Sequence, residues 1–295
     1  MTPSNLATAT AETISAETMR FLTQLGADVA GPTIDLPSYP QAALRVQRVL
    51  SDVGAGAERV VRVIGAEPVL ASRVLAMANS AALSRGGAPV VELRAAVQRL
   101  GFDTLRSAAI SFAVAQLRRA AEYRIIEKPM TQLWQRSIGV AAMCHVLAHR
   151  LGRFQPDVAL LAGLVSGIGR LYILTHSTQY PALFRDPAGY HELEQQWHSQ
   201  IGRGILENWH MSDEIIEAVG EVEEAAIDDR HRASLADLLS VAKLLHDLRD
   251  SPDVLAARLA GHRGAQRLGL SAADSMALIG ESAAEVAALR EALGR

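Results

Sequence analysis

The sequence has little cysteine, few aromatic residues and no excess of charge of one sign. Its single cysteine, Cys144, cannot form an internal disulfide, so a reducing compartment is the simpler expectation. Lys and Arg total 29 and Asp and Glu total 32, which gives a net charge of −3. The chain as a whole therefore has no general attraction for nucleic acid or for an anionic membrane. We expect a cytoplasmic protein that binds neither.

A secretory signal and a membrane-spanning helix are also missing from the sequence pattern. The first residues have neither the basic start nor the apolar stretch of a signal peptide. The most apolar segment, 158–174, is interrupted by Arg170, and its uncharged part ends at Gly169. That part is shorter than the roughly 20 residues that cross a bilayer. We expect this segment to form a buried helix.

Alternating β-branched runs bounded by turns, which would predict strands, do not occur. Aromatic residues make up only 4% of the chain, whereas Ala and Leu are abundant and favour helices. Apolar residues recur with helical spacing through most of the sequence. The predicted fold is therefore all-α. Helices are predicted at about 5–29, 40–51, 56–64, 67–78, 92–100, 103–121, 130–151, 157–174, 190–209, 213–225, 233–249, 252–261 and 272–293.

A first group of short motifs lies between residues 36 and 106. The segment Leu36-Pro37-Ser-Tyr-Pro40 contains two prolines, which exclude a helix and predict an extended connector. The helix that opens with Glu67-Pro ends in Asn79-Ser80. The next helix ends in Leu100-Gly101, just before another helix begins.

A second group of motifs lies between residues 133 and 209. It comprises Leu133-Trp134-Gln-Arg136-Ser137, the run Ala-Gly-Leu-Val-Ser-Gly-Ile-Gly at 162–169, and a segment from Glu194 to Trp209 that contains His198. In this order, the two groups resemble the HDOD domain over about residues 30–225. HDOD domains are degenerate relatives of HD-type phosphohydrolases. The resemblance implies a helical N-terminal lobe packed on an HD-phosphohydrolase-like helical bundle.

The resemblance also suggests how the chain is divided. We expect an N-terminal helix at 1–29, an HDOD domain at 30–228 with lobes at 30–122 and 129–228, and C-terminal helices at 229–295 that complete the second lobe. The best-matching motif residues are expected to be structural: Asn79 would cap or bridge its helix end, Gly101 would permit a tight turn, and the two tryptophans would anchor the second lobe. These structural residues are Leu36, Pro37, Pro40, Asn79, Ser80, Gly101, Trp134 and Trp209.

HD-type phosphohydrolases bind divalent metal through His and Asp side chains, and the metal activates water and neutralises phosphate charge. At the position of the central His-Asp pair this sequence has Ser166-Gly167, and at an upstream His position it has Arg136. The late His-rich position reads Glu-Val-Glu-Glu at 221–224. Only His198 remains, and one histidine cannot form a dedicated metal site. The resemblance therefore implies a protein with no metal, no cofactor and no catalytic residue.

One His-Asp dipeptide and one histidine pair are further candidate sites. His246-Asp247 is a literal His-Asp dipeptide, but it lies after the metal helices of the family, and we expect it on the exposed face of a helix end. His145 and His149 are spaced i, i+4 and could share a metal, but no third ligand is visible in the sequence. We expect both pairs to be structural.

Three functions remain open. The first is a bacterial signalling or regulatory protein that acts by binding other signalling proteins, with a homodimer as one option. The second is a nucleotide-binding sensor, in which the former metal cavity holds a cyclic dinucleotide and Arg136 meets a phosphate. The third is a divergent metal-dependent phosphodiesterase with ligands such as His198, His145 and His149. The candidate ligand- or partner-binding residues are Arg136, Ser166, His198 and Asn79.

Overall fold

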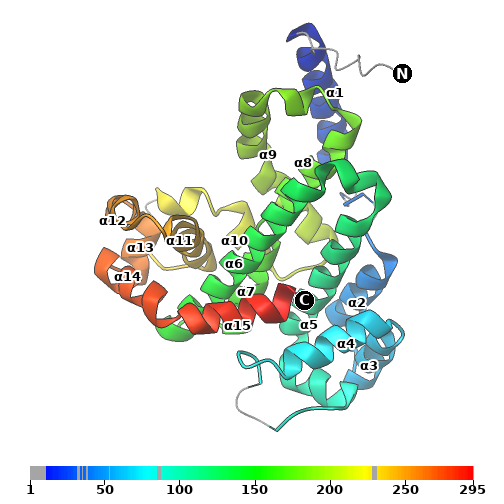
Figure 1. Cartoon of the computed structure of the whole chain (residues 1–295), viewed down its shortest axis with the longest axis vertical. Helices are drawn as coiled ribbons and strands as arrows, with labels where there is room; N and C mark the ends of the chain where they lie inside the picture. The colour runs from blue at the N-terminus through cyan, green and yellow to red at the C-terminus, as the bar shows by residue number, and fades with distance from the viewer. Residues whose placement is uncertain are drawn as a thin grey trace, which may run out of the picture.

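The computed structural model describes residues 11–31, 34, 36–37, 39–52, 54–84, 88–227 and 231–294. Across these residues the regular structure is helical and no strand is present, so the predicted all-α class is confirmed (Figure 1). The N-terminal helix predicted at 5–29 is described as α1 (Ala11–Ala30). The first six residues of that prediction lie outside the described part of the chain.

The N-terminal lobe contains the four helices α2 (Gln41–Ser51), α3 (Ala57–Gly65), α4 (Pro68–Ala78) and α5 (Leu93–Arg119). We predicted separate helices at 92–100 and 103–121, and α5 consists of two such helical stretches that meet at the non-helical residue Gly101. The backbone of Gly101 has φ 75° and ψ 171°, a region that side chains disfavour. Gly101 therefore ends one helical stretch and changes the direction of the chain before the next, as expected.

Asn79 fastens the end of α4 to the segment that leads into α5. Its amide nitrogen donates to the carbonyls of Leu75 at 3.0 Å and Val90 at 2.7 Å. Its amide oxygen accepts from the Val90 N–H at 2.7 Å. The neighbouring Ser80 hydroxyl donates to the Met77 carbonyl at 2.8 Å. Both polar side chains thus satisfy backbone groups at a helix end.

The double-proline connector packs against the second lobe. Leu36 is buried, and the carbonyl of Pro37 accepts a hydrogen bond from the Tyr123 hydroxyl at 3.3 Å. Pro40 is the N-cap residue of α2. The Trp209 ring lies against Tyr39 with 4.8 Å between ring centroids. The connector is therefore held in place through Leu36, the Pro37 carbonyl and the Tyr39 ring.

The second lobe contains α6 (Glu127–Leu151), α7 (Pro156–Val165), α8 (Ile168–His176), α9 (Pro187–Asn208) and α10 (Asp213–Gly220). A 3₁₀ helix, Ala121–Ile126, precedes it at the boundary predicted for the lobes. Trp134 and Cys144 are both buried on α6, and burial raises the pKa of the Cys144 thiol. A thiol held in its protonated form is a poor nucleophile.

The apolar segment predicted as one helix at 157–174 is two helices. It breaks at Ser166–Gly167, where the Ser166 hydroxyl donates to the Gly163 carbonyl at 2.7 Å. Over Pro156–Gln179 the chain is long and apolar enough to cross a membrane, but 89% of its most apolar stretch is buried inside the protein. The predicted burial is confirmed, whereas the predicted continuity is wrong.

Glycines in this segment allow helices to approach closely. A Cβ on Gly163 would lie 2.5 Å from the Ala141 Cα of α6. A Cβ on Gly169 would overlap the backbone carbonyl of His198 on α9. At neither position is there room for a side chain, so close packing of the helices requires glycine at both.

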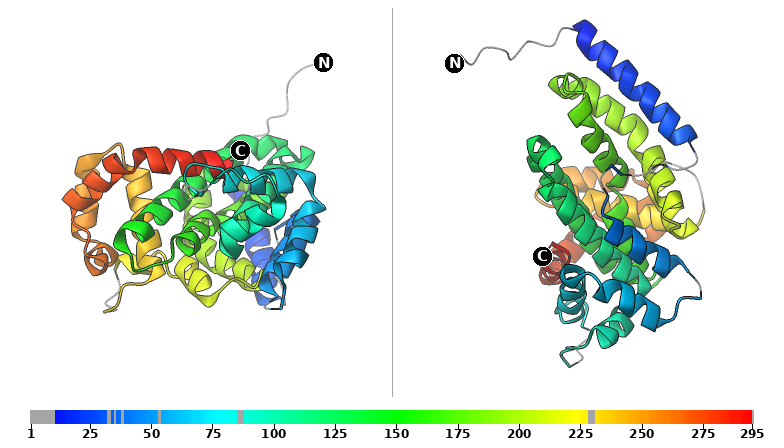
Figure 2. Two further views of the ribbon diagram at one scale, coloured as in Figure 1. Left: turned by 90° about the horizontal axis from the view of Figure 1, so that it is seen from below. Right: turned by 90° about the vertical axis from the view of Figure 1, so that its right-hand side faces the viewer.

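The C-terminal helices are α11 (Leu235–Leu248), α12 (Pro252–Ala260), α13 (Arg263–Leu268), α14 (Ala272–Glu281) and α15 (Ala283–Gly294). Helix α13 was not predicted, and the helix predicted at 272–293 is divided in two at Ser282. Both α11 and α15 pack on α6. Figures 1 and 2 show α1 at one end of the molecule, beside α8 and α9. It lies far from α3 and α4, although these helices are closer to it in the sequence.

Candidate functional site

The positions that the sequence resemblance assigns to metal ligands lie on several helices of the second lobe. Arg136 is on α6, Ser166 and Gly167 form the break between α7 and α8, and His198 is on α9. The hydroxyl of Ser166 is occupied by its bond to a helix carbonyl. A Cβ on Gly167 would lie 2.6 Å from the Ser137 hydroxyl, so no larger residue fits there without a shift. This break therefore offers no metal ligand.

Arg136 is paired with Asp247 of α11. Its Nε donates to Oδ1 at 2.9 Å and its Nη2 donates to Oδ2 at 2.5 Å, a two-bond geometry that suits a guanidinium and a carboxylate. The carboxylate lies 111 residues away in the sequence. The pair fastens α11 to α6 at one of the former ligand positions.

The dipeptide His246-Asp247 was expected on the exposed face of a helix end, and Asp247 is exposed there, whereas His246 is half-buried. Asp247 forms the ion pair with Arg136. The His246 ring lies over Gly139 of α6, where a Cβ would overlap it. Burial lowers the pKa of His246 to about 4, although nearby Asp247 opposes the shift. The dipeptide is therefore part of the contact between α6 and α11.

His198 is almost completely buried, with 2% of its side chain exposed. Its Nε2 lies 3.1 Å from Arg170 Nη2 and 3.5 Å from Glu223 Oε1. A guanidinium nitrogen can only donate, so Nε2 accepts and the ring is neutral. Burial, the largest cause, lowers the pKa of His198, the Arg170 charge lowers it further, and Glu223 opposes both. His198 Nε2 therefore already accepts a hydrogen bond from the Arg170 guanidinium and is not available as a metal ligand.

Glu223 completes the network. The Lys243 ammonium donates to Glu223 Oε1 at 2.7 Å. The Lys243 ammonium holds the pKa of the Glu223 carboxyl below its usual range, although burial opposes the shift. Burial lowers the pKa of Lys243, and its attraction to Glu223 opposes that shift. The region around His198 is therefore held by a hydrogen bond between α8 and α9 and by an ion pair between α11 and the segment after α10.

The residues around His198 do not fit a metal ion. Arg170 and Lys243 place two cations next to the single histidine, and these would repel a divalent cation. In the described part of the chain, no group of three or more His, Cys, Asp or Glu side chains is placed to hold a metal. The donor set is thus unlike the three or four ligands of known protein metal sites.

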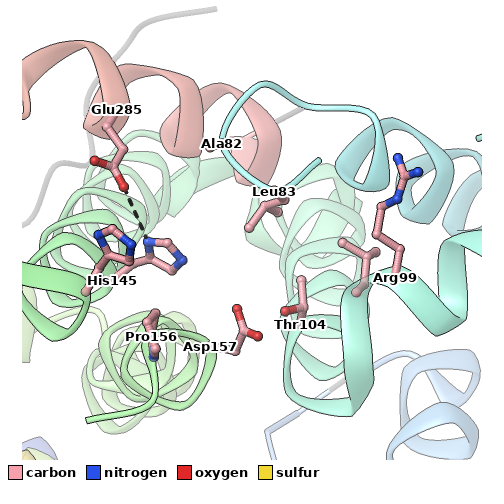
Figure 3. Close-up of a pocket in the computed structure, with 10 residues that line it drawn as sticks. Ala82, Leu83, Arg99, Thr104, His145, Pro156, Asp157 and Glu285 are labelled. Carbon is pink, nitrogen blue, oxygen red and sulfur yellow. Dashed lines mark ion pairs between the residues drawn. The ribbon is translucent and has the colours of Figure 1, made fainter. Parts of the chain in front are cut away.

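The pair His145 and His149 lies at a different pocket, of about 380 Å³, between the two lobes and α15 (Figure 3). Asp157 and Glu285 line the same pocket, and His145 Nδ1 is 3.9 Å from Glu285 Oε1. Two carboxylates therefore lie near the histidine pair, a proximity that the sequence could not show. The four side chains still do not form a metal-binding group in this arrangement.

A larger open pocket of about 780 Å³ lies beside His198. We call it the basic pocket. It carries four basic side chains and only two carboxylates, so it is positively charged when its histidine is neutral. Of the charged residues that line this pocket, the sequence indicates only Arg136 as a candidate for ligand binding. Arg170 is visible in the sequence as the one charge inside an apolar run. The charged residues of the basic pocket are Arg136, Arg170, Glu223, Lys243, Asp247 and Arg258.

Comparison with known structures supports the fold. The "Putative metal-dependent phosphohydrolase" of Shewanella amazonensis SB2B has a TM-score of 0.75 and 25% identity, covering 94% of this chain and 99% of its own. An HDOD domain protein of unknown function from Geobacter sulfurreducens has a TM-score of 0.62 and 21% identity, covering 96% and 98%. A "Putative signal transduction protein" from Marinobacter aquaeolei VT8 has a TM-score of 0.59 and 20% identity, covering 98% and 68%.

No curated protein matches the chain. The family model for the HDOD domain matches residues 36–225, which is more than half of the sequence. This range contains the double-proline connector, both lobes and all of the residues from Arg136 to Glu223 described above. The chain therefore belongs to the HDOD domain family.

Proposed function

We propose that this chain is a non-catalytic, cytoplasmic signalling protein that acts by binding other signalling proteins. The observation that carries the proposal is the replacement of the metal ligands by ion pairs. Arg136 is neutralised by Asp247, and His198 faces the guanidinium of Arg170. A phosphohydrolase of this fold needs a metal to activate water, and these side chains oppose one.

The similarity to other structures agrees with a signalling role. One protein of the same fold, from Marinobacter aquaeolei VT8, carries the name "Putative signal transduction protein". Another, from Shewanella amazonensis SB2B, is named as a phosphohydrolase. The electrostatics around His198 favour the first kind of function for this chain, because they leave hydrolysis without its metal.

Two measurements on the full chain test the proposal. The first is hydrolysis of bis(p-nitrophenyl) phosphate and cyclic di-GMP with Mn²⁺, Mg²⁺ or Fe²⁺ added; we expect no product above the rate without protein. The second is capture of partners from the native cell with the purified chain as bait; we expect the same signalling protein in repeated captures. Metal-dependent turnover that is lost in His198→Ala would instead establish the divergent phosphodiesterase.

A homodimer is a further expectation of this proposal. Sedimentation or light scattering of the full chain would show whether two copies associate. Partner binding does not require it, so the oligomeric state and the capture experiment answer separate questions.

A further inference from the structure

Arg170 stands in the basic pocket without a carboxylate partner. The Arg170 guanidinium donates to the neutral ring of His198. No carboxylate of the described residues lies within ion-pair distance of Arg170. Its Nε is buried and has no hydrogen-bond partner. A buried donor on a charged group costs free energy unless an acceptor satisfies it. The Arg170 guanidinium therefore has unused capacity for an anion.

Further positive charge gathers around Arg170. Lys243 lies in the same pocket, and the charges of Arg170 and Arg136 both oppose protonation of Lys243 after the larger effect of burial. Arg258 of α12 also lines the pocket. Like charges held near one another repel, so an anion between them is stabilised by all of them at once.

The same pocket also contains a neutral donor, the Ser240 hydroxyl. The Ala265 N–H donates to His262 Nδ1 at 3.1 Å, so in the neutral ring the proton is on Nε2. That nitrogen faces the Ser240 hydroxyl at 3.1 Å, and a hydroxyl that accepts one bond can still donate its own proton. Ser240 and His262 both line the basic pocket.

We propose that the basic pocket binds a small molecule carrying one or more phosphate groups, with Arg170 and Lys243 as its principal anion contacts. Guanidinium and ammonium groups are the side chains that recognise phosphate oxygens. The volume of about 780 Å³ lies within the range of sites for nucleotide-sized molecules. The nucleotide-sensor hypothesis started from Arg136, but Arg136 is already neutralised by Asp247. This inference does not rest on the proposed function, because a protein-binding module can have or lack such a site.

Calorimetry on the full chain tests the proposal, with inorganic phosphate, pyrophosphate, GTP and cyclic di-GMP as probes at constant ionic strength. We expect heat of binding with at least one probe, and the ranking of the four shows whether the base contributes. Arg170→Gln and Lys243→Gln should each weaken binding by about tenfold or more, because each removes a charge-assisted contact. The exposed Arg258→Gln should weaken it less and cannot disturb the core.

Two further variants make the test depend on the sign of the charge. Glu223→Gln removes the carboxylate that occupies Lys243, so it should strengthen binding. Arg203→Gln removes an exposed arginine of α9 that pairs with Glu207 outside the pocket, and should leave binding unchanged. Circular dichroism would confirm that each variant is folded. Absence of heat with all four probes, or unchanged binding in folded Arg170→Gln and Lys243→Gln, would overturn the proposal.

Discussion

Arg170 donates a hydrogen bond to His198 Nε2 at 3.1 Å, and the bond places a permanent cation on the nitrogen that would otherwise face a metal. His198 is the histidine that the sequence resemblance assigns to a metal-ligand position. Its buried ring is therefore committed to the charge network of the second lobe. The chain keeps the helical framework of the fold while its central polar residues bind one another.

Four histidines whose rings are buried or half-buried make stability depend on pH. Burial is the largest cause that lowers the pKa of each of them, so between the lowered values and about 6.5 the unfolded chain binds protons that the folded chain does not. The free energy of unfolding should therefore fall as the pH falls from 7 to 5, by about 1–3 kcal/mol. The depressed pKa of Glu223 adds a loss only at lower pH. These histidines are His176, His198, His246 and His262.

Urea unfolding at pH 7 and pH 5 measures this dependence. His246→Gln should reduce the difference, because the folded-state pKa of His246 is about 4. Equal or greater stability at pH 5 would contradict the buried, neutral state of these rings.

Close helix packing predicts opposite effects for two glycine substitutions. Gly169→Ala should lower the free energy of unfolding by about 2–3 kcal/mol, because the new Cβ would overlap the His198 carbonyl. Gly26→Ala in α1 meets no atom within 4 Å and should raise stability by about 0.5–1 kcal/mol through helix propensity. Thermal or urea unfolding of the two variants tests the prediction. A tolerated Gly169→Ala would mean that α8 and α9 are farther apart than described.

Two ion pairs with different burial should differ in energetic weight. Arg267 donates to both carboxylate oxygens of Asp237, whose side chain is fully buried, and Arg267→Ala would leave that charge unpaired. We expect a loss of about 3–5 kcal/mol. The Arg136–Asp247 pair is partly exposed, so Arg136→Ala should cost about 1 kcal/mol or less. Urea unfolding of both variants compares them directly, and an equal cost would show that burial does not set the energy.

Much of the fold was predictable because helical periodicity is a local signal. The limits of α2, α3 and α4 follow from nearby proline and from apolar spacing. The break at Ser166–Gly167, where the Ser166 hydroxyl donates to the Gly163 carbonyl, was missed because it lies within an unbroken apolar run. Helix α13 has six residues and is too short to show a period.

The site was predictable only where one residue carries its own signal. Ser166-Gly167 and Arg136 stand at motif positions and could be interpreted individually. The partners of the network could not, because Asp247 is 111 residues from Arg136 and Lys243 is 20 residues from Glu223. Ion pairs between distant helices leave no pattern in a single sequence. The sequence therefore places His246-Asp247 at an exposed helix end, but does not show that both residues also contact α6.

Elemental analysis of the purified full chain tests the central claim most directly, namely that the metal centre has been replaced by ion pairs. The chain would be produced with Mn²⁺, Fe²⁺ and Zn²⁺ in the medium and measured after dialysis without chelator. We predict metal far below one ion per chain, with no change in His198→Ala. One or two tightly bound ions per chain, lost in His198→Ala, would contradict the account.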